Sequence, residues 1–159
     1  MAVQGDFERA GSMAYRLLSV RSHSEHELAA KLRRKGLDDA IIRDVVNMLL
    51  EYGMLDDAAY ARGYIRRRMY GKPIGRGLLA RELKQRGIDG DIIESQLMGI
   101  GPEMEYKSAL ALARKKLEGM GGDFSCTRIA SYLWRRGFGG DTIARVYRWL
   151  EDCVDIDSP

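Results

Sequence analysis

Several features that define large protein classes are scarce or absent in this 159-residue chain. Its two cysteines, Cys126 and Cys153, suit a reducing compartment better than a disulfide scaffold. No run of about 18 apolar residues occurs, so the sequence predicts no membrane-spanning helix. The first residues also lack the charged-then-apolar pattern of a secretion signal. We therefore expect a cytoplasmic protein that has no membrane partner.

Residues that carry out catalysis or hold a cofactor are equally scarce. The two histidines, His23 and His26, offer no metal-ligand spacing, and no nucleophile stands in a recognisable pattern with a base. Residues 71–77, Gly-Lys-Pro-Ile-Gly-Arg-Gly, lack the spacing of a phosphate-binding loop, and no predicted strand precedes them. The pair Asp56-Asp57 is explained by helix capping. We therefore expect no enzyme, no metal and no cofactor, and a hydrolase or transferase is poorly supported.

The chain does contain one pattern in three copies. They read Leu-Ala-Ala-Lys-Leu-Arg-Arg-Lys-Gly, Leu-Ala-Arg-Glu-Leu-Lys-Gln-Arg-Gly and Ile-Ala-Ser-Tyr-Leu-Trp-Arg-Arg-Gly, and they end at Gly36, Gly87 and Gly137. The glycines recur about 50 residues apart, a period typical of tandem arrays of one supersecondary unit. Such arrays present extended surfaces and usually bind something long. The repeat therefore favours a binding protein over an enzyme with a pocket.

Each copy predicts a helix, a glycine cap and a second helix. Apolar residues four apart, such as Leu28 and Leu32, indicate the first helix, and basic residues fill its last turn. The glycine then occupies the position of a left-handed C-terminal cap. Asp38, Asp89 and Gly139 occupy the cap position of the helix that follows.

A further helix precedes each copy, so the repeating unit has three helices. We expect these first helices at about Glu8–Leu18, Asp57–Met69 and Glu103–Leu117. No alternating strand pattern remains, and the sequence therefore predicts an all-α, elongated protein of three tandem three-helix repeats. The predicted boundaries are 1–51 for the first repeat, 52–99 for the second, 100–151 for the third and 152–159 for an acidic tail.

Basic residues are concentrated in the second repeat, where Glu82 is the only acid between residues 62 and 86. A row of guanidinium groups on a helix suits phosphate groups or an acidic protein groove. A solvated face that keeps the protein soluble is the alternative, and the missing acids favour binding. The candidate partner- or DNA-binding residues are Arg62, Arg66, Arg67, Lys72, Arg76, Arg81, Lys84 and Arg86.

Six other positions receive structural interpretations. Arg68 falls on the apolar side of its predicted helix, so we expect it to pair with a carboxylate of a neighbouring helix rather than to recognise a partner. Ser24 and Glu27 form a predicted capping box, beside which His23 should be exposed. The two tryptophans, at residues 134 and 149, have helical spacing and are expected in the core or between repeats.

Three segments of the chain form a recognisable combination. They are residues 52–65 (Tyr-Gly-Met-Leu-Asp-Asp-Ala-Ala-Tyr-Ala-Arg-Gly-Tyr-Ile), the Gly-Lys-Pro-Ile of residues 71–74 and the leucine–glycine pattern of residues 79–88. Together they resemble the RecX family of bacterial recombination regulators. The resemblance extends over about residues 14–151. It implies a curved helical protein without catalytic residues. It also implies a role in DNA repair and the SOS response.

The resemblance further implies the partner and its regulation. RecX proteins bind the filament that RecA recombinase forms on single-stranded DNA, and they inhibit strand exchange and ATPase activity. Weak DNA binding is also implied. We therefore expect a monomer that regulates RecA. A helical DNA- or RNA-binding protein without a protein partner is the alternative, and its affinity should fall steeply with salt.

Overall fold

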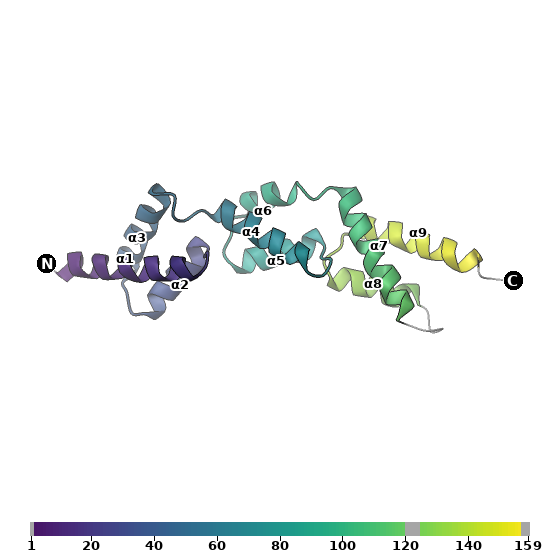
Figure 1. Cartoon of the computed structure of the whole chain (residues 1–159), viewed down its shortest axis with the longest axis horizontal. Helices are drawn as coiled ribbons and strands as arrows, with labels where there is room; N and C mark the ends of the chain where they lie inside the picture. The colour runs from purple at the N-terminus through teal and green to yellow at the C-terminus, as the bar shows by residue number, and fades with distance from the viewer. Residues whose placement is uncertain (1, 120–124, 157–159) are drawn as a thin grey trace. The chain divides into compact units, whose positions relative to one another are not determined.

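The computed structural model describes residues 2–119 and 125–156, and these form helices joined by short loops (Figure 1). No strand occurs among the described residues. The helices are α1 (Ala2–Val20), α2 (Glu25–Arg34), α3 (Asp39–Glu51), α4 (Asp57–Tyr70), α5 (Arg76–Gln85), α6 (Gly90–Leu97), α7 (Pro102–Glu118), α8 (Cys126–Arg135) and α9 (Gly140–Ile156). The prediction of an all-α protein built from three-helix units is confirmed.

The three repeat glycines occupy equivalent positions. Gly36, Gly87 and Gly137 have φ angles of 81°, 75° and 85°, in the left-handed region that glycine adopts most easily. After each glycine the next amide reaches back across the helix end; for example, the Ile88 amide donates to the Leu83 carbonyl at 3.2 Å. This bond accompanies a glycine C-cap and satisfies a carbonyl that the helix leaves open. The predicted caps are therefore confirmed.

The predicted N-terminal caps are also present. Ser24 Oγ accepts a hydrogen bond from the Glu27 amide at 3.1 Å, and Asp38 Oδ1 accepts from the Ala40 amide at 2.8 Å. Asp56 Oδ1 accepts from the Ala59 amide at 2.9 Å. Each bond satisfies an amide that has no partner within its helix. Local sequence thus fixes where these helices begin.

The chain divides into two compact units, of which the first comprises Met1–Tyr64 and Leu83–Gln96. Helices α1, α2 and α3 pack against one another in this unit. Leu28 and Leu32 from α2 meet Val45 and Leu49 from α3, and all four are fully buried. Each buried leucine contributes about 1.5–3 kcal/mol relative to an exposed one.

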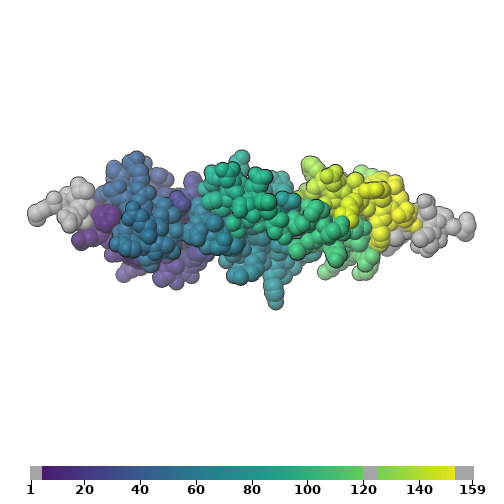
Figure 2. All heavy atoms as spheres, turned by 90° about the horizontal axis from the view of Figure 1, so that it is seen from above, coloured from purple at the N-terminus to yellow at the C-terminus, as the bar shows by residue number. Residues whose placement is uncertain are grey.

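The second unit comprises Ile65–Glu82 and Leu97–Pro159. Its core joins α7, α8 and α9, and includes Ile129, Leu133 and Leu150. Figure 2 shows the yellow atoms of α9 packed on the light green atoms of α8. Among the described helices, none is both long and apolar enough to cross a lipid bilayer.

Two sequence-based expectations about single side chains are wrong. Trp134 is 65% exposed rather than buried, because Leu133 beside it takes the inward position on α8. His23 is 3% exposed rather than solvated. Its Nδ1 lies 2.9 Å from the Arg21 carbonyl oxygen and its Nε2 lies 2.8 Å from Lys31 Nζ. Burial lowers the pKa of His23, so the neutral ring is favoured.

Candidate interaction surface

Most of the predicted basic residues have exposed side chains on or beside α4 and α5. Arg76 and Arg86 are partly buried. The exposed ones are Arg62, Arg66, Arg67, Lys72, Arg81 and Lys84. Helix α4 turns its apolar side inward through Ala61 and Ile65, which leaves the positions that follow each of them, Arg62 and Arg66, on the solvent side one turn apart.

Arg68 and Glu82 form a paired contact between α4 and α5. Arg68 Nε donates to Glu82 Oε2 at 2.8 Å, and Arg68 Nη2 donates to Glu82 Oε1 at 2.6 Å. This geometry confirms the expected pairing of Arg68. Because two parallel bonds to a carboxylate fix both side chains, the one acid of the basic stretch is already engaged.

We call the contact between the first and second repeats the first junction, and it lies within the first unit. Ser24 Oγ donates to the Arg86 carbonyl at 2.6 Å. The buried Asp57 accepts a hydrogen bond from the Glu25 amide at 2.9 Å through Oδ1. Gly87 lies so close to α2 that an added Cβ would be 2.2 Å from His26 Cβ. The start of α2 is therefore covered by a carboxylate, a carbonyl and a glycine.

The guanidinium of Arg86 contributes to the same junction. It lies 4.4 Å from the centre of the Tyr64 ring, and its Nε is 3.9 Å from Glu27 Oε1. Arg21 Nη1 also pairs with Glu27, at 3.0 Å from Oε2. Burial raises the pKa of the Asp57 carboxyl. Arg86 was predicted as a partner contact, and the structure places it in this internal network.

We call the contact between the second and third repeats the second junction, and it lies within the second unit. Glu105 Oε1 accepts a hydrogen bond from the Arg76 amide at 2.9 Å. The Gly75 amide donates to the Arg136 carbonyl at 2.9 Å, and the Gly77 amide donates to the Gly137 carbonyl at 2.9 Å. The start of α5 is thus covered by the same three kinds of group as the start of α2.

Backbone approaches backbone in the second junction. A Cβ added at Gly75 would lie 2.2 Å from the Gly137 carbonyl carbon, and a Cβ at Gly137 would lie 2.2 Å from the Leu78 amide nitrogen. Arg136 Nε donates to the Pro73 carbonyl at 3.2 Å, and its Nη2 donates to the Lys72 carbonyl at 3.3 Å. These bonds hold the loop before α5, which carries Lys72.

A hollow of about 420 Å³ lies beside that loop. Lys72, Lys115 and Lys116 line it together with Tyr132, and the described residues that line it include no carboxylate. Lys116 Nζ lies 5.5 Å from the centre of the Tyr132 ring. Sequence reasoning missed Lys115 and Lys116, because basic residues in the last turn of a helix are explained by the helix dipole. The hollow suits an anionic group such as a phosphate.

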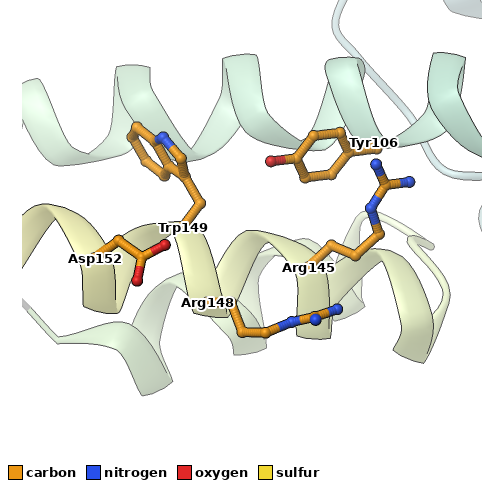
Figure 3. A pocket seen from close by; sticks show the side chains of 5 residues that line it. All are labelled: Tyr106, Arg145, Arg148, Trp149 and Asp152. Carbon is orange, nitrogen blue, oxygen red and sulfur yellow. The ribbon is translucent and has the colours of Figure 1, made fainter.

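A second hollow, of about 350 Å³, lies between α7 and α9 (Figure 3). In this hollow Arg145 lies 4.0 Å from the centre of the Tyr106 ring and pairs with Glu103 at 2.7 Å. Asp152 shares the hollow with Arg148. Because the acids offset the arginines here, this hollow attracts an anion less than the lysine-lined one.

Comparisons with known proteins place these features in a family. The family model described as "RecX, first three-helix domain" matches residues 10–49, and "RecX, second three-helix domain" matches residues 56–97. A relative named "Regulatory protein RecX" from Thermobifida fusca is 32% identical over 96% of this chain and 85% of its own length. The chain belongs to the RecX family. The same name is borne by a Prosthecochloris aestuarii relative, 37% identical over 87% of this chain and 91% of its own.

Solved RecX structures have the same fold. The crystal structure of RecX from Lactobacillus salivarius superposes with a TM-score of 0.86, at 24% identity over 93% of this chain and 98% of that one. A second structure, described as regulatory protein RecX, gives a TM-score of 0.83 at 24% identity over 95% of this chain and 74% of that one. The helical repeats are therefore a RecX fold, and the named relatives are regulatory proteins.

Proposed function

We propose that this protein binds the filament of RecA on single-stranded DNA and inhibits RecA. The observation that carries the proposal is the match, along nearly the whole chain, to relatives named regulatory protein RecX. RecA enters this proposal as the partner that the resemblance to the RecX family implies. We propose regulation by binding, without a chemical step, in the cytoplasm where the filament forms.

The basic residues supply the contacts in this proposal. The exposed side chains of Arg62, Arg66, Arg67, Arg81 and Lys84 have their charge in solvent, and Lys72 lies at the lysine-lined hollow. A nucleoprotein filament offers phosphates and acidic side chains, and both attract such groups. We add Lys115 and Lys116 to the candidate contacts. Arg86 and Arg76 contribute less, because both are partly buried.

A nucleic-acid-binding protein without a protein partner is the second candidate. The exposed arginines of α4 and the lysine-lined hollow favour it, since phosphate contacts alone would use the same side chains. Affinity would then depend on the number of phosphates neutralised and fall steeply with salt. The two candidates differ in whether RecA adds to the binding.

The test measures RecA ATPase activity and filament length on single-stranded DNA at increasing concentrations of this protein. We expect both to fall. The double variant Arg62→Glu/Arg66→Glu should inhibit less at the same concentration, and so should Lys72→Glu/Lys115→Glu. The folding cost of such surface changes should stay within about 0.5 kcal/mol. RecA activity that does not change with the wild-type protein would contradict the proposal.

A matched control reverses charge outside the candidate surface. Arg16 and Arg43 are exposed in the first repeat. Arg16→Glu/Arg43→Glu changes the net charge by the same amount as Arg62→Glu/Arg66→Glu. We expect the control to inhibit RecA nearly as well as wild type. Equal losses in both variants would mean that net charge, not the α4 surface, governs binding.

A further inference from the structure

Each repeat junction joins two defined surfaces. One is the start of the second helix of a repeat, which we call the socket: residues 24–26 in the first repeat and 75–77 in the second. The other belongs to the next repeat, and we call it the plug. A plug consists of a carboxylate from the first helix, the left-handed glycine and the carbonyl before that glycine. Both junctions use this same set of groups.

The first repeat has residues of the same kinds at all three plug positions. In the second and third repeats, the plug carboxylate is followed four residues later by an alanine that is fully buried. Asp6 has this relation to Ala10, as Asp57 has to Ala61 and Glu105 to Ala109. The glycine of this plug is Gly36, and the carbonyl before it belongs to Lys35.

This first plug contacts no socket in the described part of the chain. An added Cβ at Gly36 would meet nothing within 4 Å, whereas at Gly87 or Gly137 it would lie 2.2 Å from a neighbouring repeat. Lys35 and Gly36 are exposed. Yet Gly36 holds a φ of 81°, close to the 75° of Gly87 and the 85° of Gly137. The plug therefore has the conformation of its equivalents without their partner.

The third repeat contains the equivalent helix start at Ser125, Cys126 and Thr127, and we call it the open socket because no hydrogen bond joins it to a plug among the described residues. Ser125 is the N-cap of α8, and its side chain makes no capping hydrogen bond. Thr127 is exposed. These residues correspond to 24–26 in the first repeat, and Ser125 matches Ser24, whose hydroxyl donates to a plug carbonyl at 2.6 Å. The starts of α2 and α5 are each contacted by a plug from the next repeat. By analogy, the start of α8 should accept a plug as well.

We propose that the open plug of one copy of this chain docks into the open socket of a second copy. Asp6 accepts from the Cys126 amide, the Lys35 carbonyl accepts from the Ser125 hydroxyl, and Gly36 lies against Thr127. The two surfaces are different, so the contact is head-to-tail and leaves a plug and a socket open for further copies. The expected monomer is then the state at low concentration. This inference does not depend on the proposed function.

Sedimentation equilibrium of the full chain tests the proposal, at concentrations from about 1 μM to 1 mM, which bracket weak association. The average mass of wild type should rise with concentration beyond that of a dimer. Asp6→Lys removes the plug carboxylate and brings a cation to the positive end of α8. Thr127→Trp fills the socket. Each variant alone should remain a monomer.

A mixture of the two variants makes the test specific. The Thr127→Trp chain retains its plug and the Asp6→Lys chain retains its socket, so an equal mixture should form dimers and stop there. Glu8→Lys and Ser131→Trp are controls of matched charge and size on the same helices, and should associate like wild type. Circular dichroism melting checks that each variant folds.

Three results would overturn the proposal. The first is a wild-type mass that stays monomeric over the whole range. The second is association of Asp6→Lys or Thr127→Trp to the extent of wild type, because another surface would then be responsible. The third is a mixture that remains monomeric while wild type associates and both variants are folded.

Discussion

The two repeat junctions join equivalent surfaces, but different chemical groups make the hydrogen bonds. In the first, side chains predominate: the Ser24 hydroxyl donates to a carbonyl, and Arg86 lies over the Tyr64 ring. In the second, the Gly75 and Gly77 amides donate to carbonyls at 2.9 Å, and backbone meets backbone. The carboxylate that caps the helix start is common to both.

The difference shows which part of a repeat contact can vary. A hydroxyl can replace a backbone amide as donor to the plug carbonyl, because both reach the same acceptor. The third socket position can carry a side chain, as His26 does in the first junction, only where the backbones of the two repeats stay further apart than in the second junction. We therefore expect the first junction to respond to charge and pH, and the second to respond to added bulk.

The largest effect should come from alanine substitutions at the two junction glycines, Gly137 and Gly87. Gly137→Ala should lower the free energy of unfolding by about 3 kcal/mol, because left-handed strain adds to overlap with the Leu78 backbone. Gly87→Ala should cost about 2 kcal/mol, since its added atom meets the His26 side chain instead. Urea unfolding measures these differences.

Gly36→Ala is the matched control for this series. Its φ is equally positive, but an added Cβ meets nothing within 4 Å, so only the conformational cost of about 1 kcal/mol should remain. Equal losses in all three variants would mean that the glycines serve their own helix ends alone. The close approach at the junctions would then contribute nothing measurable to stability.

The fold was predictable where local chemistry determines it. Gly36, Gly87 and Gly137 end helices because a left-handed cap needs glycine, and residues four apart such as Leu28 and Leu32 mark a buried face. These signals lie within a few residues of each other. The pairing of Arg68 with a carboxylate was predictable for a related reason, since a cation on an apolar helix face requires a partner.

The next largest loss of stability should come from replacing the arginine of each junction. Arg136→Met should cost about 2 kcal/mol, because it removes hydrogen bonds from a charged group to the carbonyls of Lys72 and Pro73. Arg86→Met should cost about 1 kcal/mol, the scale of a cation over an aromatic ring. Urea unfolding at low and high salt measures both changes. Salt should reduce the cost of Arg86→Met more, because its Glu27 contact is screened. A larger effect of salt on Arg136→Met than on Arg86→Met would contradict the role of the Arg86–Glu27 contact in the first junction.

The junctions themselves were beyond sequence reasoning. Asp57 was explained by local capping, yet it caps the start of α2, 32 residues earlier. Nothing in local spacing reports such a contact. Comparing repeats would have helped, since a carboxylate precedes a buried alanine by four residues in each. Trp134 was misplaced because periodicity cannot distinguish a tryptophan on the inner face from one beside it.

The smallest effects should appear in the pH dependence of the first junction. Burial raises the pKa of Asp57. The folded state therefore binds this proton at higher pH than the unfolded state, and acidification from neutral pH to about pH 4 should stabilise wild type relative to Asp57→Asn. Chemical denaturation of both proteins across this range measures the difference. The Asn side chain keeps an acceptor for the Glu25 amide, so the comparison isolates ionisation.

Glu27 should behave in the opposite way. Burial by itself raises its pKa, but the hydrogen bond and charge of Arg21, with help from Tyr60 and Arg86, hold the pKa below its ordinary value. Wild type should therefore lose stability relative to Glu27→Gln as pH falls below about 5. Parallel pH profiles for Asp57→Asn and Glu27→Gln would contradict the assignment of these two environments.

Relative affinity for the RecA filament and for the same naked single strand tests the central claim of RecA regulation most directly. Fluorescence anisotropy of labelled wild-type protein at physiological salt measures both affinities. We predict much tighter binding to the filament, and a partial loss of that preference in Arg62→Glu/Arg66→Glu as the α4 charge is reversed. Equal affinity of the wild type for filament and naked strand would contradict the account and favour a nucleic-acid-binding protein without a protein partner.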